Sequence, residues 1–155
     1  MNTNWIYYGL FLTNKSRENL IKYLKSDNAP EEISKILKDN NVKLIIDHCT
    51  LLHINQAKDN VKLCSYLDDL YKRSENYFIP IGITAIGYSD KAVAFKCILP
   101  LFKEMNICAN KIPHITICTL NGGKPVDSNN ITNWIKIDFT YVYSNISRIY
   151  KMTVL

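Results

Sequence analysis

Two of the three histidines in this 155-residue chain stand two places before a threonine. They form the motifs His48-Cys-Thr50 and His114-Ile-Thr116. In a β-strand, residues i and i+2 point to the same face, so each motif would set an imidazole beside a hydroxyl. Two such strands facing each other would surround an anion-sized gap with two proton-transfer groups and two hydroxyl donors. We therefore predict a site that cleaves a phosphodiester without a metal ion.

The chemistry of such a site follows from its residue types. Imidazole serves as base or acid near neutral pH because its unperturbed pKa is about 6.5. His48 as base with His114 as acid, and the reverse assignment, are both consistent with the sequence. Thr50 and Thr116 would donate hydrogen bonds to the non-bridging phosphate oxygens, where charge accumulates in the transition state. These four residues are the predicted catalytic set.

The third histidine, His53, is predicted to have a structural role. It lies an odd number of residues from His48 and Thr50, so a regular strand would turn it to the opposite face. A metal site is not predicted, because no His-x-x-x-His or His/Cys cluster has usable spacing. The five cysteines are odd in number and show no Cys-x-x-Cys spacing, which favours a reducing setting without disulfides. Cys49 and Cys118 have apolar neighbours and are predicted core residues.

Three further residues are candidate substrate contacts. Lys124 stands in a Gly-Gly-Lys-Pro loop, although the Walker pattern is absent and a solvated lysine is the alternative interpretation. Tyr8 and Tyr143 could stack on a nucleobase, with packing inside a strand as the alternative.

The predicted elements place both motifs on strands. Apolar and β-prone runs predict strands over 5–13, 42–54, 79–88, 92–99, 112–120, 135–143 and 147–154. Helices are predicted after a Ser16 cap, from Pro30, over 57–73 and after Asp127 or Ser128, with one or two helical turns over 101–105. Because strands and helices do not alternate regularly, the fold class is α+β with antiparallel sheet. Each half contains a strand, a helix and a motif-bearing strand, which indicates two similar lobes meeting at a groove.

Length and composition limit the function classes. The chain is most simply one domain over 1–155, and 47% hydrophobic with 21% charged residues is typical of a globular protein. A net charge of +5 suits an anionic substrate, but the chain lacks the dense basic stripe of a duplex-DNA-binding protein. No apolar run approaches the ~20 residues that span a bilayer, and the N-terminus has no signal-peptide features. We expect a cytoplasmic protein that binds neither membrane nor duplex DNA, with its oligomeric state, homodimer included, left open.

The segments His48–His53 and Pro113–Ile117 resemble the paired signature of the two-histidine phosphoesterase superfamily. The chain is also similar to the tRNA-ligase-type cyclic phosphodiesterase branch, in a strand-turn-strand at Gly87–Ala92 and a Gly-Lys-Pro-Val-Asp-Ser-Asn stretch at Gly123–Asn129. The resemblance covers roughly residues 5–154. It implies a bilobal fold of two antiparallel sheets lining a central groove, with helices outside. It also implies metal-independent cleavage of phosphodiesters at a ribose 2′ or 3′ oxygen, and no cofactor is expected.

Members of this superfamily open 2′,3′-cyclic phosphates on RNA ends, or cut 2′,5′-oligoadenylate or cyclic dinucleotide messengers. The sequence has no ligase or kinase domain beside the motifs, and its Asn-, Ile-, Lys- and Tyr-rich composition is typical of AT-rich genomes, many viral ones among them. We therefore expect a standalone viral phosphodiesterase acting in the host cytosol on 2′,3′-cyclic GMP-AMP, with 2′,5′-oligoadenylate next, that antagonises nucleotide-based immune signalling. RNA-end repair is the alternative, and a non-catalytic module that sequesters nucleotides is the third.

Overall fold

The computed structural model describes residues 4–74 and 77–150 of the chain. Its strands are β1 (Trp5–Leu12), β2 (His48–His53), β3 (Ile79–Tyr88), β4 (Ala92–Ile98), β5 (His114–Thr119) and β6 (Asn133–Tyr150). Its α-helices are α1 (Asn14–Leu24), α2 (Glu31–Asp39), α3 (Ile54–Ala57) and α4 (Val61–Arg73). Two 3₁₀ turns, η1 (Pro100–Phe102) and η2 (Pro125–Asn130), complete the described elements. The fold class is α+β, as the sequence predicts.

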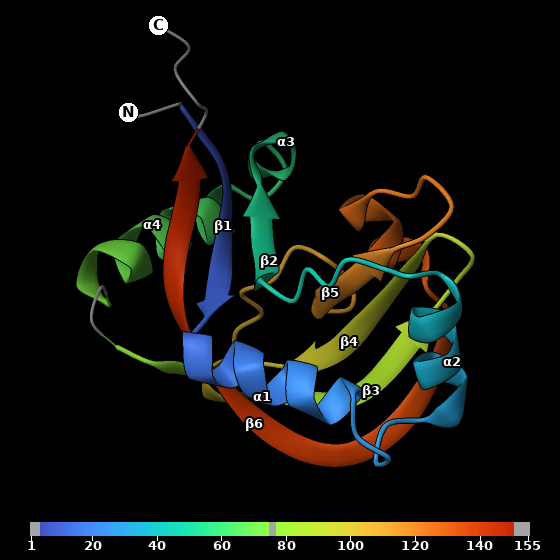
Figure 1. The fold of residues 1–155 in the computed structure, drawn as a ribbon. Coiled ribbons are helices and arrows are strands. Elements are labelled where there is room, and N and C mark those ends of the chain that lie inside the picture. The colour runs from blue at the N-terminus through green and yellow to red at the C-terminus, as the bar shows by residue number, and fades with distance from the viewer. Residues whose placement is uncertain (1–3, 75–76, 151–155) are drawn as a thin grey trace, which may run out of the picture.

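All six strands belong to one antiparallel sheet, which closes in the order β1-β2-β5-β4-β3-β6. The 18-residue β6 makes this closure. Its first part pairs with β3 as far as Ser144, and its last part, from Ser144 to Tyr150, pairs with β1. Figure 1 shows this strand curving along the bottom of the molecule and then rising beside β1.

This arrangement differs from the two separate sheets and the two final strands expected from the sequence. The expected strands 135–143 and 147–154 form one strand as far as Tyr150, and residues 151–154 lie outside the described part. The polar residues between them do not interrupt β6, because Ser144 is fully buried and its hydroxyl donates to the Ile79 carbonyl at 2.8 Å. Two strand groups, β1-β2 and β3-β4-β5, therefore share β6.

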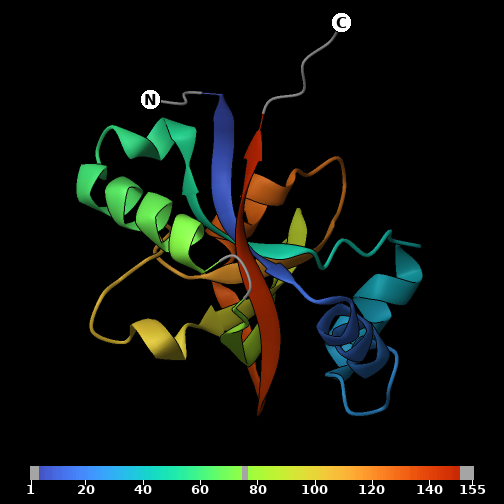
Figure 2. The ribbon, with the colours of Figure 1, turned by 90° about the vertical axis from the view of Figure 1, so that its left-hand side faces the viewer.

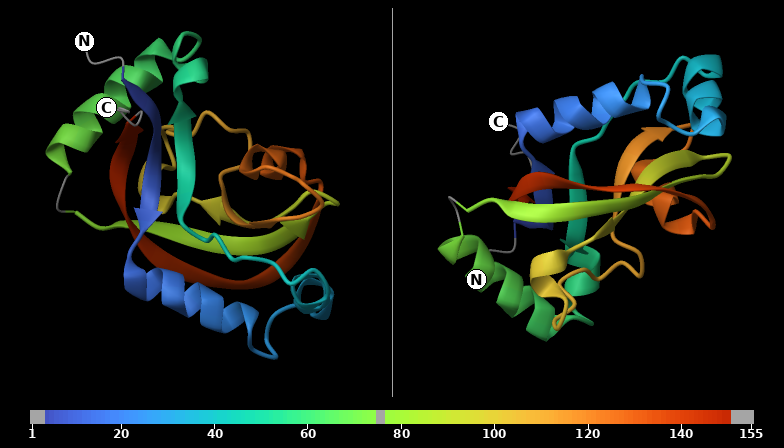
Figure 3. Two further views of the ribbon diagram at one scale, coloured as in Figure 1. Left: turned by 45° about the horizontal axis from the view of Figure 1, so that its top comes forward. Right: turned by 90° about the horizontal axis from the view of Figure 1, so that it is seen from below.

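The helices cover two sides of this sheet. α4 and the α1–α2 pair lie on opposite sides of β6 (Figure 2), and the view from below shows the sheet between α1 and α4 (Figure 3). Leu20 and Leu24 of α1 and Leu67 of α4 belong to the same buried core as the strand interiors. No helix in the described ranges 4–74 and 77–150 has the length and apolar character needed to cross a bilayer.

Two local boundaries also differ from the sequence expectation. Thr13 caps α1, since its hydroxyl accepts from the Ser16 amide at 3.2 Å, so Ser16 lies inside the helix instead of at its cap. The first motif strand begins at His48 instead of Val42. The segment before it bends at Ile46, whose φ of 42° is left-handed. The amides of Ile45 and Ile46 donate to carbonyls of β5, so this segment leads directly into the motif.

Candidate active site

The two motif strands, β2 and β5, are neighbours in the sheet. Cys49 pairs with Ile115 across the two strands, and these are the middle residues of the two motifs. Both middle side chains are fully buried in the core. Because side chains alternate along a strand, the flanking histidines and threonines point to the other face. The fold thus brings the two predicted motifs side by side.

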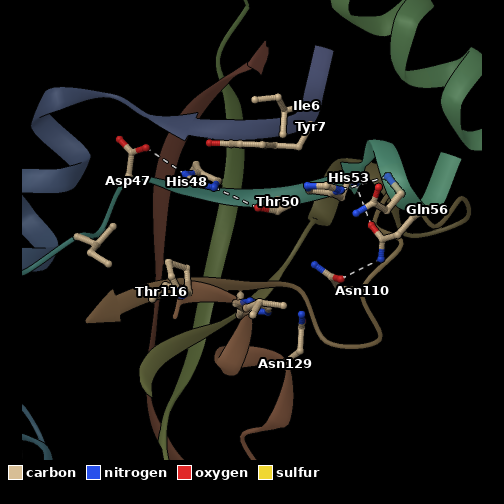
Figure 4. A pocket seen from close by; sticks show the side chains of 15 residues that line it. Ile6, Tyr7, Asp47, His48, Thr50, His53, Gln56, Asn110, Thr116 and Asn129 are labelled. Atoms are coloured by element: carbon tan, nitrogen blue, oxygen red, sulfur yellow. Dashed lines mark hydrogen bonds and ion pairs between the residues drawn. The ribbon is translucent and has the colours of Figure 1, made fainter. Parts of the chain in front are cut away.

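That face forms one wall of a cavity of about 560 Å³. All four residues of the predicted catalytic set line it. Figure 4 shows the residues of β2 along one side of the cavity, with Thr116 of β5 on the other side. Its full lining is Ile6, Tyr7, Ile45, Asp47, His48, Thr50, His53, Asn55, Gln56, Asn110, His114, Thr116, Pro125, Val126 and Asn129.

His48 is held through both ring nitrogens. Its Nδ1 donates to the Asp47 carboxylate at 3.0 Å, and its Nε2 shares a 3.1 Å hydrogen bond with the Thr50 hydroxyl. The ring also stacks against Tyr7 and Phe11, with centroids 5.0 and 4.9 Å away. This packing and the carboxylate fix the ring orientation and place the Nδ1 proton toward Asp47, so Nε2 is the nitrogen presented beside Thr50.

Gly9 of β1 makes room for this stack. A Cβ at Gly9 would lie 3.1 Å from the Phe11 ring, which is closer than an ordinary van der Waals contact. It would also lie 3.4 Å from Cδ2 of His48, at the lower limit of such a contact. Gly9 is also the cross-strand partner of Thr50. The absence of a side chain at Gly9 therefore lets the aromatic rings close over the first motif.

His114 has a different environment. Its side chain is buried, and its Nδ1 donates to the Ile112 carbonyl at 2.9 Å. Burial lowers the pKa of His114, and the nearby His48 lowers it further, although the Ile112 hydrogen bond opposes the shift. In its neutral form the ring therefore carries its proton on Nδ1 and has an unprotonated Nε2.

Thr116 is positioned by η2. Its hydroxyl shares a 2.9 Å hydrogen bond with the hydroxyl of Ser128, which is buried. The Pro125 and Val126 side chains of the same turn line the cavity. The Gly123–Asn129 stretch singled out in the sequence thus contributes to the second motif, but through Ser128 and not through Lys124.

The structure overturns the expected orientation of His53. Tyr8 pairs with Leu52 while the next residue, Gly9, pairs with Thr50, so Leu51 is an extra residue in β2. Such a β-bulge inserts one residue and shifts the alternation of faces. His53 consequently lies on the same face as Thr50 and lines the cavity. The sequence argument assumed a regular strand, which is why it placed His53 on the other side.

The three candidate substrate contacts lie outside the cavity lining. Tyr8 is 1% exposed, and its hydroxyl contacts Asp68 and Arg148 on the core side of β1, so it cannot stack on a base. Lys124 uses its backbone amide to bind the Asp127 carboxylate at 2.7 Å. Tyr143 is half exposed on β6, where its amide donates to the Ser16 hydroxyl. None of the three side chains belongs to the lining.

Sequence reasoning also missed residues that surround the motifs. Asp47 had a detectable signal, since a carboxylate directly preceding a candidate catalytic histidine is a natural partner for its ring. Tyr7 and Ser128 had none, because their contacts depend on which strand and turn fold against the motifs. Cys49 and Cys118 are fully buried, as expected, and burial raises the pKa of Cys118 to about 11.

Similarity to known proteins identifies the family of this chain. The profile of the fungal tRNA ligase phosphodiesterase domain matches residues 2–150. No curated protein sequence matches the chain. Among solved structures, the crystal structure of a fungal RNA kinase is similar with a TM-score of 0.62 and 17% identity. The match covers 97% of this chain and 46% of that one, so this chain corresponds to less than half of the longer protein. At this identity the likeness concerns the fold.

Proposed function

Since the chain belongs to the family of fungal tRNA ligase phosphodiesterase domains, we propose that it hydrolyses 2′,3′-cyclic phosphates at RNA ends. The family makes the chain a phosphodiesterase, a hydrolase. The observation that supports this substrate best is the cavity, in which two histidines and two threonines from adjacent strands line one space. In a cyclic phosphate, two ribose oxygens are bonded to one phosphorus. Hydrolysis needs a base to take a proton from the attacking water and an acid to protonate the ribose oxygen that leaves, and the two histidines of the cavity can serve as these two groups.

His114 is the proposed base. Its Nδ1 proton is committed to the Ile112 carbonyl, so Nε2 has a lone pair available to take a proton from the attacking water. Burial lowers the pKa of His114 and therefore keeps the ring neutral near pH 7. As the water oxygen bonds to phosphorus, its proton passes to Nε2 of His114.

His48 is the proposed acid. The Asp47 carboxylate at its Nδ1 would offset the positive charge of a doubly protonated ring. Nε2 of His48 then gives its proton to the ribose oxygen as the bond between that oxygen and phosphorus breaks. The product is a ribose monophosphate with a free neighbouring hydroxyl, and both histidines have exchanged protonation states. A proton shift through solvent restores them.

The threonines would bind the non-bridging phosphate oxygens. The Thr116 hydroxyl is already oriented by Ser128, while the Thr50 hydroxyl is shared with His48. Donors fixed before the reaction stabilise the developing charge without a reorganisation cost. Binding of the phosphate would therefore replace the His48–Thr50 hydrogen bond with contacts from both groups to phosphate oxygens.

The family favours RNA ends over the messenger substrate expected from the sequence. The amino-acid composition favours cyclic GMP-AMP, and the comparisons add no support for that substrate or for 2′,5′-oligoadenylate. Cleavage of those messengers, a viral source and a role in immune signalling all stay predictions. The longer RNA kinase chain is instead consistent with a role in RNA repair.

The test compares substrates directly. Purified protein is incubated in EDTA with an RNA oligonucleotide ending in a 2′,3′-cyclic phosphate, with 2′,3′-cyclic GMP-AMP and with 2′,5′-oligoadenylate. We expect turnover of the RNA end at a kcat/KM well above that of either messenger. Faster cleavage of cyclic GMP-AMP would overturn the substrate proposal, and loss of turnover in EDTA would overturn the metal-free mechanism. Binding without turnover of any of the three would indicate the sequestering module.

A further inference from the structure

One end of the cavity is polar but uncharged. His53, Gln56, Asn110 and Asn129 line the cavity, and Figure 4 shows His53, Gln56 and Asn110 together at the end away from Asp47. Among the described residues that line the cavity, none is lysine or arginine. Proteins commonly bind phosphate groups with those two cations. Beyond the scissile phosphate, the lining therefore suits an uncharged part of the substrate.

His53 presents a hydrogen-bond donor at this end. Its Nδ1 accepts the Asn55 amide at 3.1 Å, so the proton of the neutral ring must reside on Nε2. The β-bulge at Leu51 turns the ring to the cavity face, where its cross-strand partner is Tyr7. Neither proton transfer nor phosphate binding, as proposed above, uses His53. Its position and its protonated nitrogen leave it available to bind another part of the ligand.

Two amide side chains are held beside His53. Oε1 of Gln56 accepts the His53 amide at 2.9 Å, and Nε2 of Gln56 donates to Oδ1 of Asn110 at 3.4 Å. Asn110 precedes β5, 54 residues from Gln56, so two distant segments converge here. The two N–H groups of Asn110 Nδ2 can still donate hydrogen bonds. Oε1 of Gln56 and Oδ1 of Asn110 can each accept one more hydrogen bond. A prearranged set of neutral donors and acceptors matches the edge of a nucleobase.

We propose that His53, Gln56 and Asn110 form a nucleobase subsite, which binds the base of the nucleotide whose phosphate is cleaved. A cavity of about 560 Å³ lies within the range of roughly 300–1,000 Å³ that small-molecule sites occupy. The phosphate lies between the two motifs, and the base reaches the amide end. This inference rests on the proposed function, and it adds that the enzyme discriminates among terminal nucleotides.

The test measures kcat/KM for the 2′,3′-cyclic phosphates of adenosine, guanosine, cytidine and uridine. His53→Asn keeps a side-chain acceptor that can bind the Asn55 amide, since Asn is a favoured helix cap, but it shortens the reach into the cavity. Asn110→Ala removes the amide opposite. Asn19→Ala, on the exposed face of α1, is the matched control. We expect the wild type and the control to prefer one base.

In His53→Asn and Asn110→Ala, kcat/KM for the preferred base should fall about 3- to 10-fold, the value of one net hydrogen bond. This fall in kcat/KM should come from a higher KM, while kcat/KM for the poorest of the four substrates should change little. The difference in kcat/KM between the preferred base and the others should therefore become smaller. Equal losses on all four substrates would show a merely structural role and would overturn the subsite. A wild type that treats all four alike would overturn it as well.

A binding measurement separates the subsite from the proposed reaction. Titration calorimetry gives the Kd of the four nucleoside 2′-monophosphates for the wild type and for both variants. Kd values that differ among the four bases in the wild type and become equal in the variants would support the subsite. If the wild type showed such Kd values but turned over no cyclic phosphate, only the proposed function would be refuted. Base-independent Kd values in the wild type would refute the subsite alone.

Discussion

Cys49 and Ile115 pair across β2 and β5, and each is the middle residue of a His-x-Thr motif. Leu51 follows the first motif and has no register partner on β1, and Ile117 follows the second motif and has none on β4. Each is therefore the extra residue of a β-bulge. The two motifs are therefore related by a local two-fold rotation about the Cys49–Ile115 pair. In such an antiparallel arrangement each histidine lies across from the threonine of the other motif, so one phosphate can contact both pairs.

Removing either histidine should abolish most activity. His48→Ala and His114→Asn each remove one proton-transfer group, and we expect kcat to fall at least about 100-fold. Single-turnover assays with a cyclic-phosphate RNA end provide the measurement, and circular dichroism checks the fold of each variant. A loss of only a few-fold in either variant would show that the acid and base roles are assigned wrongly.

The pH dependence should reflect the burial of His114. Because the pKa of His114 is lowered from 6.5, the base stays unprotonated below that pH. The acidic limb of kcat/KM should accordingly lie below pH 6.5, as read from a profile in buffers of constant ionic strength. An acidic limb at or above pH 6.5 would contradict His114 as the base.

Stability should follow the same group. Below pH 6.5 the unfolded chain binds a proton at this residue more readily than the folded protein does, since the folded pKa is the lower one. The contribution of His114 to the free energy of unfolding is therefore fully present above pH 6.5. It declines as the pH falls from 6.5 toward the pKa of His114 in the folded protein. Urea titrations at several pH values should show this decline in the wild type and a smaller one in His114→Gln. Equal declines would assign the effect to other groups.

Asp47 should act as a positioning residue. Asp47→Asn removes the carboxylate at His48 Nδ1, and Asp47 is 56% exposed, so the ion pair is worth little. An exposed pair contributes up to about 1 kcal/mol, so we expect kcat to fall by about 5-fold at most with KM unchanged. Asp59→Asn, outside the cavity lining, should leave kcat unaltered. A rise in KM at constant kcat would point to substrate binding instead.

Gly9 and Gly87 should separate activity from stability. In Gly9→Ala the new methyl group presses on the Phe11 and His48 rings, so we expect about a tenfold loss of kcat from the misplaced imidazole. In Gly87→Ala the methyl group would overlap the Trp134 ring, and neither Gly87 nor Trp134 lines the cavity. That variant should lose about 1–3 kcal/mol of stability and retain kcat. Thermal unfolding and steady-state kinetics of both variants are the measurements, and the reverse pattern would contradict the role of Gly9.

The sequence was enough to predict a phosphodiesterase and the α+β fold class of this protein. Two His-x-Thr motifs, each in a strand-like run, predicted side chains on a common face, since alternation along a strand depends only on local backbone geometry. The motif-flanking segments pointed to the same branch that the family profile identifies over residues 2–150. Mixed strands and helices predicted the α+β class, and the structure confirms it.

Only the tertiary structure decided what surrounds those motifs. Strand order made β2 and β5 neighbours and brought Tyr7 of β1 and Ser128 of η2 to them. The bulge at Leu51 turned His53 into the cavity, and β6 merged two expected strands and two expected sheets into one. The strand order and the bulge depend on backbone hydrogen bonds between segments distant in sequence. Because residues of any type can form such bonds, the local residue pattern does not reveal which strands pair or which side chains they bring together.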